Sequence, residues 1–347
     1  MDYFEIIKRA AKTAWHKRAL WVFGILLALT SGSASSGLRF YNFGGGNRAG
    51  SSSSRLPWGQ GFQMPRITNP FRAMPAWTTG TIIAVIVAAI LIILALVILS
   101  AIVRYVSRTA LIKMVDQNEQ IGSTGTVGDG FKKGWSKPAW RMFLIDLLIW
   151  LPFAVIGLAL LAIGLSPLLL LGLNRMAINA LAIVLAIGLS LIVLAVLIIV
   201  GLLLSVLTEL AYREAALAGA RTMPAVSSAY ALIRRRFKDV GLMWLLLFGV
   251  RIGWGLMMIP VFFILALLAL VIAGAPALAL YAATQSAAAA LILGIPVALI
   301  VIGAPALFLA GLYTTFDSAA WTLTYRELAL RPAPDAPALA EQPAQVA

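Results

Sequence analysis

The feature that most constrains this chain is a set of long apolar stretches, several of which run for about 20 residues or more without a charge. A helix of about 20 residues is long enough to cross the roughly 30 Å hydrocarbon core of a bilayer. Inside that core every backbone amide needs a partner, which only helices and closed barrels provide. Uninterrupted apolar stretches of this length favour helices. They lie at residues 19–34, 81–103, 142–165, 178–207, 242–273 and about 286–312.

Composition supports the same fold class. Hydrophobic residues make up 61% of the chain and charged residues only 12%, with a mean hydropathy of +0.95. Soluble domains carry about 25% charged residues, so this chain cannot cover itself with polar surface. We therefore predict an all-α, polytopic transmembrane protein with about six spans in a single membrane domain, residues 1–330.

The first apolar stretch, residues 19–34, has two interpretations. It is short, basic residues precede it and small residues follow it, which is also the pattern of a cleavable signal peptide. The preceding 18 residues, however, include Asp2 and Glu5 and form an amphipathic pattern that recurs later in the chain. The recurrence favours a retained helix, and the signal peptide remains the alternative.

That recurring pattern precedes the first, third and fifth apolar stretches. In each place, apolar and aromatic residues follow one another at helical spacing with lysines or arginines beside them, which predicts an amphipathic helix at the membrane interface. The three stripes are Tyr3, Ile7, Ala11, Ala14 and Trp15; Val127, Phe131 and Trp135; and Val226, Tyr230, Ile233 and Phe237.

The ends of the even-numbered spans also resemble one another. Residues 108–111, 213–216 and 317–320 each place a charged residue before small residues, about 105 positions apart. We therefore predict three pseudo-repeats, each an amphipathic helix followed by a transmembrane hairpin. Their approximate bounds are residues 1–117, 118–217 and 218–330.

Lysine and arginine positions predict the orientation. Every lysine lies in residues 1–18, 104–141 or 213–238, and these segments share one side of the membrane if there are six spans. Both termini are therefore predicted to be cytoplasmic in a protein of the plasma membrane. The opposite side carries a Gly/Ser/Pro-rich loop, residues 35–77, that we expect to be flexible, and the Pro/Ala-rich tail, residues 331–347, is expected to be disordered.

The basic segments indicate anionic lipid headgroups as the partner. They are short and adjoin membrane spans, which does not favour nucleic acid, and each juxtamembrane Lys or Arg contributes about 1 kcal/mol near an anionic surface. The alternative is that these residues only set the topology. The candidate headgroup contacts are Lys8, Arg9, Lys12, Lys132, Lys133, Lys137, Arg234, Arg235, Arg236 and Lys238.

Two ionisable residues, Asp146 and Arg251, lie inside apolar stretches. A charge at mid-bilayer costs about 2.5–3.5 kcal/mol on insertion scales, so such residues need partners or face the protein interior. We hypothesise that Asp146 and Arg251 pair between the third and fifth spans. The pair either forms a substrate or proton site or fixes the register of the two helices.

Polar and helix-breaking residues near other span ends are weaker signals. Glu209 and Asp317 are interpreted as interfacial carboxylates, with Arg213 or Arg326 as partners. Glycines and prolines in the last two spans indicate either close packing with mild kinks or broken helices at a transport site. They are Gly253, Gly255, Pro260, Gly294, Pro296, Gly303 and Pro305.

Several chemistries are excluded by composition. The chain has no cysteine and one histidine, His16, so it cannot form a disulfide, a thiolate site or a histidine cluster for a metal. It contains no Ser-His-Asp set, no HExxH and no Walker lysine. We expect no cofactor and no enzyme activity, with a membrane-embedded lipid enzyme as a distant alternative.

Residues 131–135 and the run at residues 315–326 carry a family resemblance. They resemble bacterial six-span membrane proteins of uncharacterised function, which are similar to the membrane domain attached to some glycerophosphodiester phosphodiesterases. The resemblance covers about residues 1–330 and implies a membrane module without assigned activity. This chain lacks the phosphodiesterase barrel, so no catalytic residue is carried over.

Two functions are therefore expected, of which the first is favoured. The first is a non-enzymatic membrane scaffold or lipid-interacting module whose basic helices lie on anionic lipid. The second is a small-solute or ion transporter or channel that uses Asp146 and Arg251.

Overall fold

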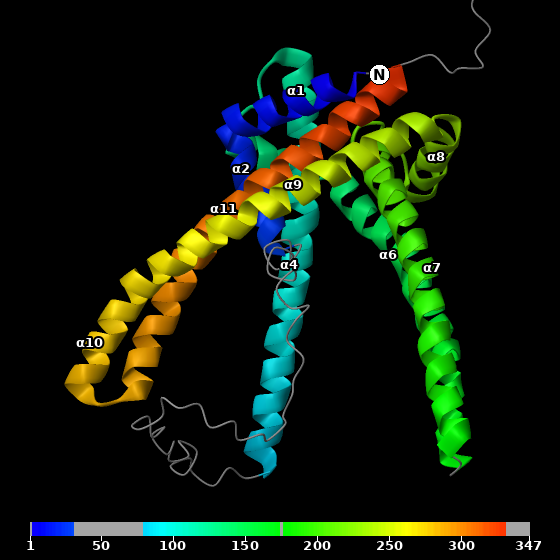
Figure 1. Ribbon diagram of the computed structural model, residues 1–347. Helices are drawn as coiled ribbons and strands as arrows, with labels where there is room; N and C mark the ends of the chain where they lie inside the picture. The colour runs from blue at the N-terminus through cyan, green and yellow to red at the C-terminus, as the bar shows by residue number, and fades with distance from the viewer. Residues whose placement is uncertain (1, 31–78, 174–175, 331–347) are drawn as a thin grey trace, which may run out of the picture. The chain divides into compact units, whose positions relative to one another are not determined.

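The computed structural model describes residues 2–30, 79–173 and 176–330, and every regular element in those ranges is a helix. The chain divides into two units, Met1–Ala34 with Val103–Ala347 and Ser35–Ile102, and the core and site described below belong to the first. In chain order the elements are α1 (Tyr3–His16), α2 (Arg18–Thr30), α4 (Thr79–Ile121), α5 (Val127–Gly134), α6 (Lys137–Leu165), η3 (Ser166–Leu173), α7 (Met176–Ala216), α8 (Thr222–Arg235), α9 (Phe237–Ala269), η4 (Leu270–Gly274), α10 (Ala275–Thr284) and α11 (Ala287–Leu330) (Figure 1).

Five helical segments of the described ranges are long and apolar enough to cross a membrane. The prediction of an all-α, polytopic membrane protein is thereby confirmed. The apolar α2 is shorter, with 13 residues, and the rest of its predicted stretch, residues 31–34, lies outside the described residues. So do the predicted outer loop, residues 35–77, and the predicted tail, residues 331–347. The five segments are α4, α6, α7, α9 with its continuation into α10, and α11.

Three helices extend well past the apolar stretches from which they were predicted. The stretches end at residues 103, 207 and 312, whereas α4, α7 and α11 continue to Ile121, Ala216 and Leu330. These extensions are mixed in polarity, so hydropathy alone does not mark them. They supply most of the buried core, in contacts with α2, α6 and α9. The core includes Leu20, Phe23, Ala110, Leu111, Met114, Met142, Ile145, Leu210, Ala215, Met243, Ala319, Ala320 and Leu323.

Threonine hydroxyls inside this core find partners within their own helices. Each donates to the carbonyl four residues earlier, at 2.7–2.9 Å between oxygen atoms, so burial leaves none of these threonine hydroxyls without a hydrogen bond. The small hydroxylated side chains also let neighbouring helices approach closely. They are Thr109, Thr208, Thr315, Thr322 and Thr324.

The closest helix crossing joins α2 to α11. A Cβ atom added to Gly24 would lie 2.4 Å from the Gly311 carbonyl oxygen, and one added to Gly311 would lie 2.8 Å from the Ile25 Cα atom. The Thr315 hydroxyl lies 3.4 Å from the Leu20 carbonyl oxygen across the same contact. The two backbones therefore touch through glycine, the geometry by which small residues join membrane helices.

Prolines do not break the last long helices. Pro296 and Pro305 lie within the continuous α11, and Pro260 lies within the continuous α9. After α9 the chain makes one turn of π-helix, η4, before α10. Of the glycines, Gly294 would place a Cβ 3.0 Å from the Ala277 Cβ, whereas Gly253, Gly255 and Gly303 have nothing within 4 Å.

Two of the short helices begin at side-chain caps. Asp2 accepts a hydrogen bond from the Glu5 amide at 3.1 Å and caps α1. At the start of α5 the Asp129 amide donates to the Thr126 hydroxyl, and the Thr126 amide and hydroxyl donate to Asp129 Oδ2 at 3.0 and 2.8 Å. The hydrogen bond from the Thr126 amide, aided by that from its hydroxyl, holds the pKa of the exposed Asp129 below its ordinary value.

Candidate functional site

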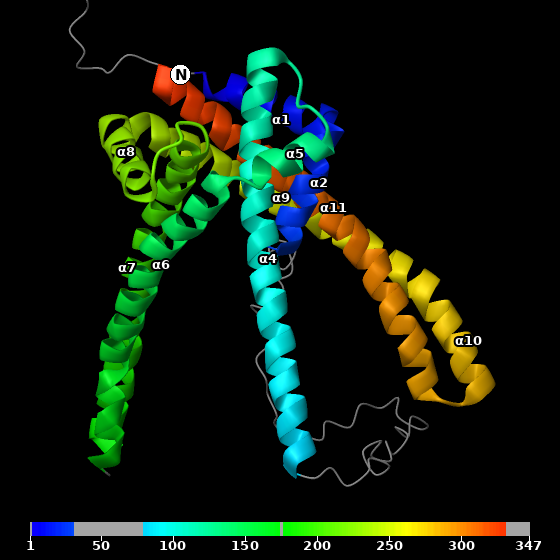
Figure 2. The same ribbon diagram turned by 180° about the vertical axis from the view of Figure 1, so that it is seen from behind.

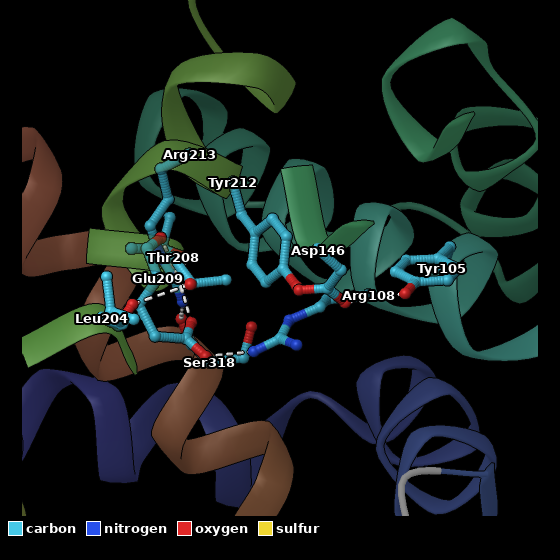
Figure 3. A network of polar contacts seen from close by, with 10 residues as sticks. Tyr105, Arg108, Asp146, Leu204, Thr208, Glu209, Tyr212, Arg213 and Ser318 are labelled. Carbon is cyan, nitrogen blue, oxygen red and sulfur yellow. Dashed lines mark hydrogen bonds and ion pairs between the residues drawn. The ribbon is translucent and has the colours of Figure 1, made fainter. Parts of the chain in front are cut away.

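Asp146 of α6 lies in a polar network that joins three helices (Figure 3). The Tyr105 hydroxyl of α4 donates to Asp146 Oδ2 at 2.7 Å, and the Tyr212 hydroxyl of α7 donates to Oδ1. Hydrogen bonds to a charged acceptor are stronger than those between neutral groups. The carboxylate therefore ties α6 to both α4 and α7.

Glu209 of α7 forms the second half of the network. Arg108 of α4 donates to Glu209 Oε1, and Arg213, one turn further along α7, donates to Oε2. The Arg213 side chain is 1% exposed, and its Nη1 also donates to the Glu209 main-chain oxygen at 2.5 Å. Its Nη2 lies 3.4 Å from the Ser318 carbonyl oxygen of α11. One carboxylate thus balances two arginines at the junction of three helices.

Arg108 connects the two halves. Its guanidinium lies over the ring of Tyr212, with Cζ 4.3 Å from the ring centroid, a cation–π distance. Figure 3 shows Asp146 and Tyr212 on one side of the junction and Glu209 and Arg213 on the other. Each oxygen of both carboxylates already accepts from a protein donor. The network can hold the helices in register without an added ligand.

Arg251 is not part of that network. It is exposed on α9 and interacts electrostatically with Asp317 of α11. The structure does not bring Asp146 and Arg251 together, contrary to the hypothesis from the sequence. The physical reason is that two tyrosine hydroxyls, 41 and 66 residues away along the chain, already satisfy the Asp146 carboxylate.

The ion pairs predicted for the other carboxylates are partly as expected. Glu209 does pair with Arg213, but it pairs with Arg108 as well and belongs to the core. Arg326 pairs with Asp116 near the end of α4. No group of three or more acidic or histidine side chains in the described ranges is arranged to hold a metal ion.

Sequence reasoning missed Tyr105, Arg108 and Tyr212 as members of the network. The available signal was the resemblance among the ends of the even-numbered spans, because Arg108 and Arg213 occupy matching positions there. That signal was used only to define repeats. It also marks the places where those helices meet.

The three short helices α1, α5 and α8 pack against the bundle through small residues four positions apart. The buried pairs are Ala10 and Ala14, Gly130 and Gly134, and Ala225 and Ala229. In α5 the approach is closest, because a Cβ atom at Gly130 would lie 2.4 Å from the Phe23 ring and one at Gly134 would lie 2.5 Å from the Val106 carbonyl oxygen. On α1 the larger side chain of Ile6 is buried as well.

Three aromatic residues of the predicted stripes face outward, whereas Tyr3 donates a hydrogen bond to Asp239 and the Phe131 ring packs against Phe23. Trp15 is 65% exposed, Trp135 is 72% exposed and Tyr230 is 60% exposed. Exposed basic residues accompany them on each helix, for example Lys132 on α5 and Arg235 on α8. Each short helix therefore presents aromatic and basic side chains away from the bundle, while its small residues face the protein.

Three of the ten candidate headgroup residues have protein partners. Arg9 pairs with Glu119, Lys133 donates to Gln117 and Arg236 lies 3.9 Å from Asp239. The remaining seven are exposed; they are Lys8, Lys12, Lys132, Lys137, Arg234, Arg235 and Lys238.

Contacts join all four basic segments of the sequence. The N-terminal helix α1 contacts the end of α4 and the start of α9, and α11 contacts the end of α4. Figure 2 shows α1, α5 and the end of α4 from behind. These contacts bring the basic segments together within the first unit. The contacts are Tyr3 with Asp239 at 2.8 Å between oxygen atoms, Arg9 with Glu119, Arg326 with Asp116, and Arg141 with the Gly219 carbonyl oxygen at 2.5 Å.

Comparison with known proteins gives one match. Residues 13–325 match the model of a family described as "Family of unknown function (DUF7544)". No curated protein and no solved structure matches the chain.

Proposed function

We propose that the chain, which belongs to the family of unknown function DUF7544, is a non-enzymatic, lipid-interacting module of the membrane. The observation that carries the proposal is the shared construction of α1, α5 and α8. Each packs onto the bundle through small residues and turns aromatic and basic side chains outward.

This construction suits the boundary between headgroups and hydrocarbon. Tryptophan and tyrosine favour that boundary because their rings are apolar and their N–H or O–H groups are polar. Lysine and arginine beside them attract anionic headgroups. A helix that rests in the interface needs both features on its outward surface, and small residues on the other surface allow it to lie close to the membrane spans.

The orientation of the module follows from the same residues. Because the basic segments gather on one side, we place that side at the cytoplasmic leaflet of the plasma membrane, with both termini in the cytoplasm.

The test is lipid retention by the full chain. The protein is reconstituted in nanodiscs of phosphatidylcholine with a fraction of phosphatidylglycerol, and the retained lipids are measured by native mass spectrometry. We expect enrichment of the anionic lipid over its share in the disc. Replacing Lys132, Arg234 and Arg235 by glutamine should reduce that enrichment.

The matched control keeps the charge at the same positions, as Lys132→Arg with Arg234→Lys and Arg235→Lys, and should retain the enrichment. Equal lipid composition in the disc and on the protein would contradict the proposal. A solute or ion flux in proteoliposomes that is lost with Asp146→Asn would favour the transporter class instead.

A further inference from the structure

A pocket of about 300 Å³ lies between α1 and the C-terminal end of α4. This volume is at the lower end of the roughly 300–1,000 Å³ range of small-molecule sites, and it is large enough for a headgroup-sized anion. From α1 and its C-terminal cap come Arg9, Lys12, His16 and Lys17. From α4 come Asn118 and Glu119.

The fold brings these residues together for local reasons. Arg9, Lys12 and His16 are three to four positions apart, so they share one face of α1. At the end of α4, Gly122 has a φ of +69°, a left-handed conformation that glycine adopts without strain and that turns the chain away from the helix. The Gly122 carbonyl then accepts a 2.9 Å hydrogen bond from Lys17 Nζ.

The pocket holds more positive charge than its acidic residue balances. Arg9 and Glu119 form an ion pair, and the partner of Lys17 is a neutral carbonyl. The ammonium group of Lys12 has no hydrogen bond or ion pair with any described residue. The ends of α1 and α4 favour a cation near their carbonyls, which accounts for Lys17 but leaves Lys12 without a structural role.

A second polar group in the pocket lacks a partner. The amide oxygen of Asn118 is buried, and no described residue donates a hydrogen bond to it. Buried acceptors of this kind are usually satisfied, so a ligand that supplies a hydroxyl donor would complete the site. The His16 ring is fixed beside them, because its Nδ1 lies 3.0 Å from the Lys12 carbonyl oxygen.

We propose that this pocket binds a phosphate group carrying a hydroxyl-bearing substituent. Lys12 and Lys17 donate to the phosphate oxygens, and the hydroxyl donates to Asn118. Phosphatidylglycerol and free glycerol phosphate share this chemistry. The assignment deepens the proposed lipid function by naming one specific site among the exposed basic residues, and the exposed Trp15 next to His16 holds the pocket at headgroup level.

The experiment measures phosphatidylglycerol bound to the full chain in nanodiscs by native mass spectrometry, with phosphatidic acid as the lipid lacking the hydroxyl. Lys12→Gln removes a donor inside the pocket, and Arg221→Gln removes an exposed charge at the start of α8, outside the pocket and outside the candidate headgroup residues. We expect about tenfold weaker binding with Lys12→Gln, as for the loss of one charge-assisted hydrogen bond. We expect little change with Arg221→Gln.

A second variant tests the hydroxyl. Asn118→Leu should abolish the preference for phosphatidylglycerol over phosphatidic acid, and a thermal melt checks that the variant is folded. Free glycerol phosphate distinguishes the sources of the ligand. If it binds in discs of phosphatidylcholine alone with the same dependence on Lys12, the pocket is supported and its ligand is soluble.

Equal weakening by Lys12→Gln and Arg221→Gln would overturn the pocket, because the lipid would then respond to the total surface charge and not to one site. The wider lipid proposal would survive that result. An absence of anionic lipid enrichment in the unmodified protein, together with no binding of glycerol phosphate, would overturn both.

Discussion

Glu209 is the single residue whose loss should destabilise this protein most. It accepts hydrogen bonds from Arg108 and Arg213, whose side chains are 17% and 1% exposed. Glu209→Gln keeps the size of the side chain but removes its charge, so two close guanidinium groups face each other. Removing one partner of a buried ion pair costs about 3–5 kcal/mol, because the remaining charge cannot reach water.

The control is Glu119→Gln, which breaks the ion pair with Arg9. Arg9 is 43% exposed and can hydrate when its partner is lost, so the expected cost is about 1 kcal/mol or less. Both variants are compared with the unmodified chain by thermal unfolding in the same detergent or nanodisc. A double variant, Glu209→Gln with Arg213→Gln, should recover part of the loss, since it removes one of the two uncompensated charges.

Equal destabilisation by Glu209→Gln and Glu119→Gln would refute this reasoning. It would mean that the network around Glu209 is hydrated in the folded protein, and that its charges contribute no more than surface pairs do. Strict additivity in the double variant would separately refute the coupling between Glu209 and Arg213.

Two further predictions concern packing and capping. Gly311→Ala places a Cβ 2.8 Å from the Ile25 Cα atom and should lower the stability measured in a thermal melt by about 1–3 kcal/mol. Gly303→Ala on the same helix meets nothing within 4 Å and should be close to neutral. Equal shifts of the melting temperature in the two variants would contradict the close crossing. The pKa of Asp129 is lowered in the folded protein, so its cap stabilises α5 above the ordinary aspartate pKa and is lost as pH falls through the folded value. The protection factors of the α5 amides, which are exchange rates corrected for the intrinsic pH dependence of amide exchange, should therefore fall on acidification. The same fall in Asp129→Asn would exclude this cap as the cause.

The sequence was sufficient to predict the long helices but not the contacts between them. The apolar stretches predicted the long helices because hydrocarbon imposes both their length and their hydrogen bonding. Hydropathy could not mark the extensions of α4, α7 and α11, since charged residues such as Arg108, Glu209 and Asp317 stand among their buried apolar residues. Those extensions hold the core.

The polar network shows that contacts between helices could not be predicted for the site either. The sequence singled out Asp146 as a charge that needs a partner, and it has two partners in the structure, Tyr105 and Tyr212. A tyrosine in an apolar helix is equally compatible with a lipid boundary or a buried hydrogen bond. Periodicity within one helix does not show which residues of another helix face it, so Arg251 was paired with Asp146 from charge alone.

The divided surroundings of the α5 stripe have a similar explanation. In the sequence, a stripe of Val127, Phe131 and Trp135 is typical of a helix face that contacts something apolar. The pattern does not distinguish a protein core from a lipid surface. In the structure Val127 and Phe131 pack against the protein, whereas Trp135 is 72% exposed.

The crossing of α2 and α11 has a consequence for biosynthesis. The ribosome makes Gly24 nearly 290 residues before Gly311, an interval of about 15–60 s at roughly 5–20 residues per second. Throughout that interval α2 cannot make its final contact with α11, because α11 has not yet been synthesised. We therefore expect α2 to remain in lipid, or bound to an insertion factor, until α11 has left the ribosomal exit tunnel.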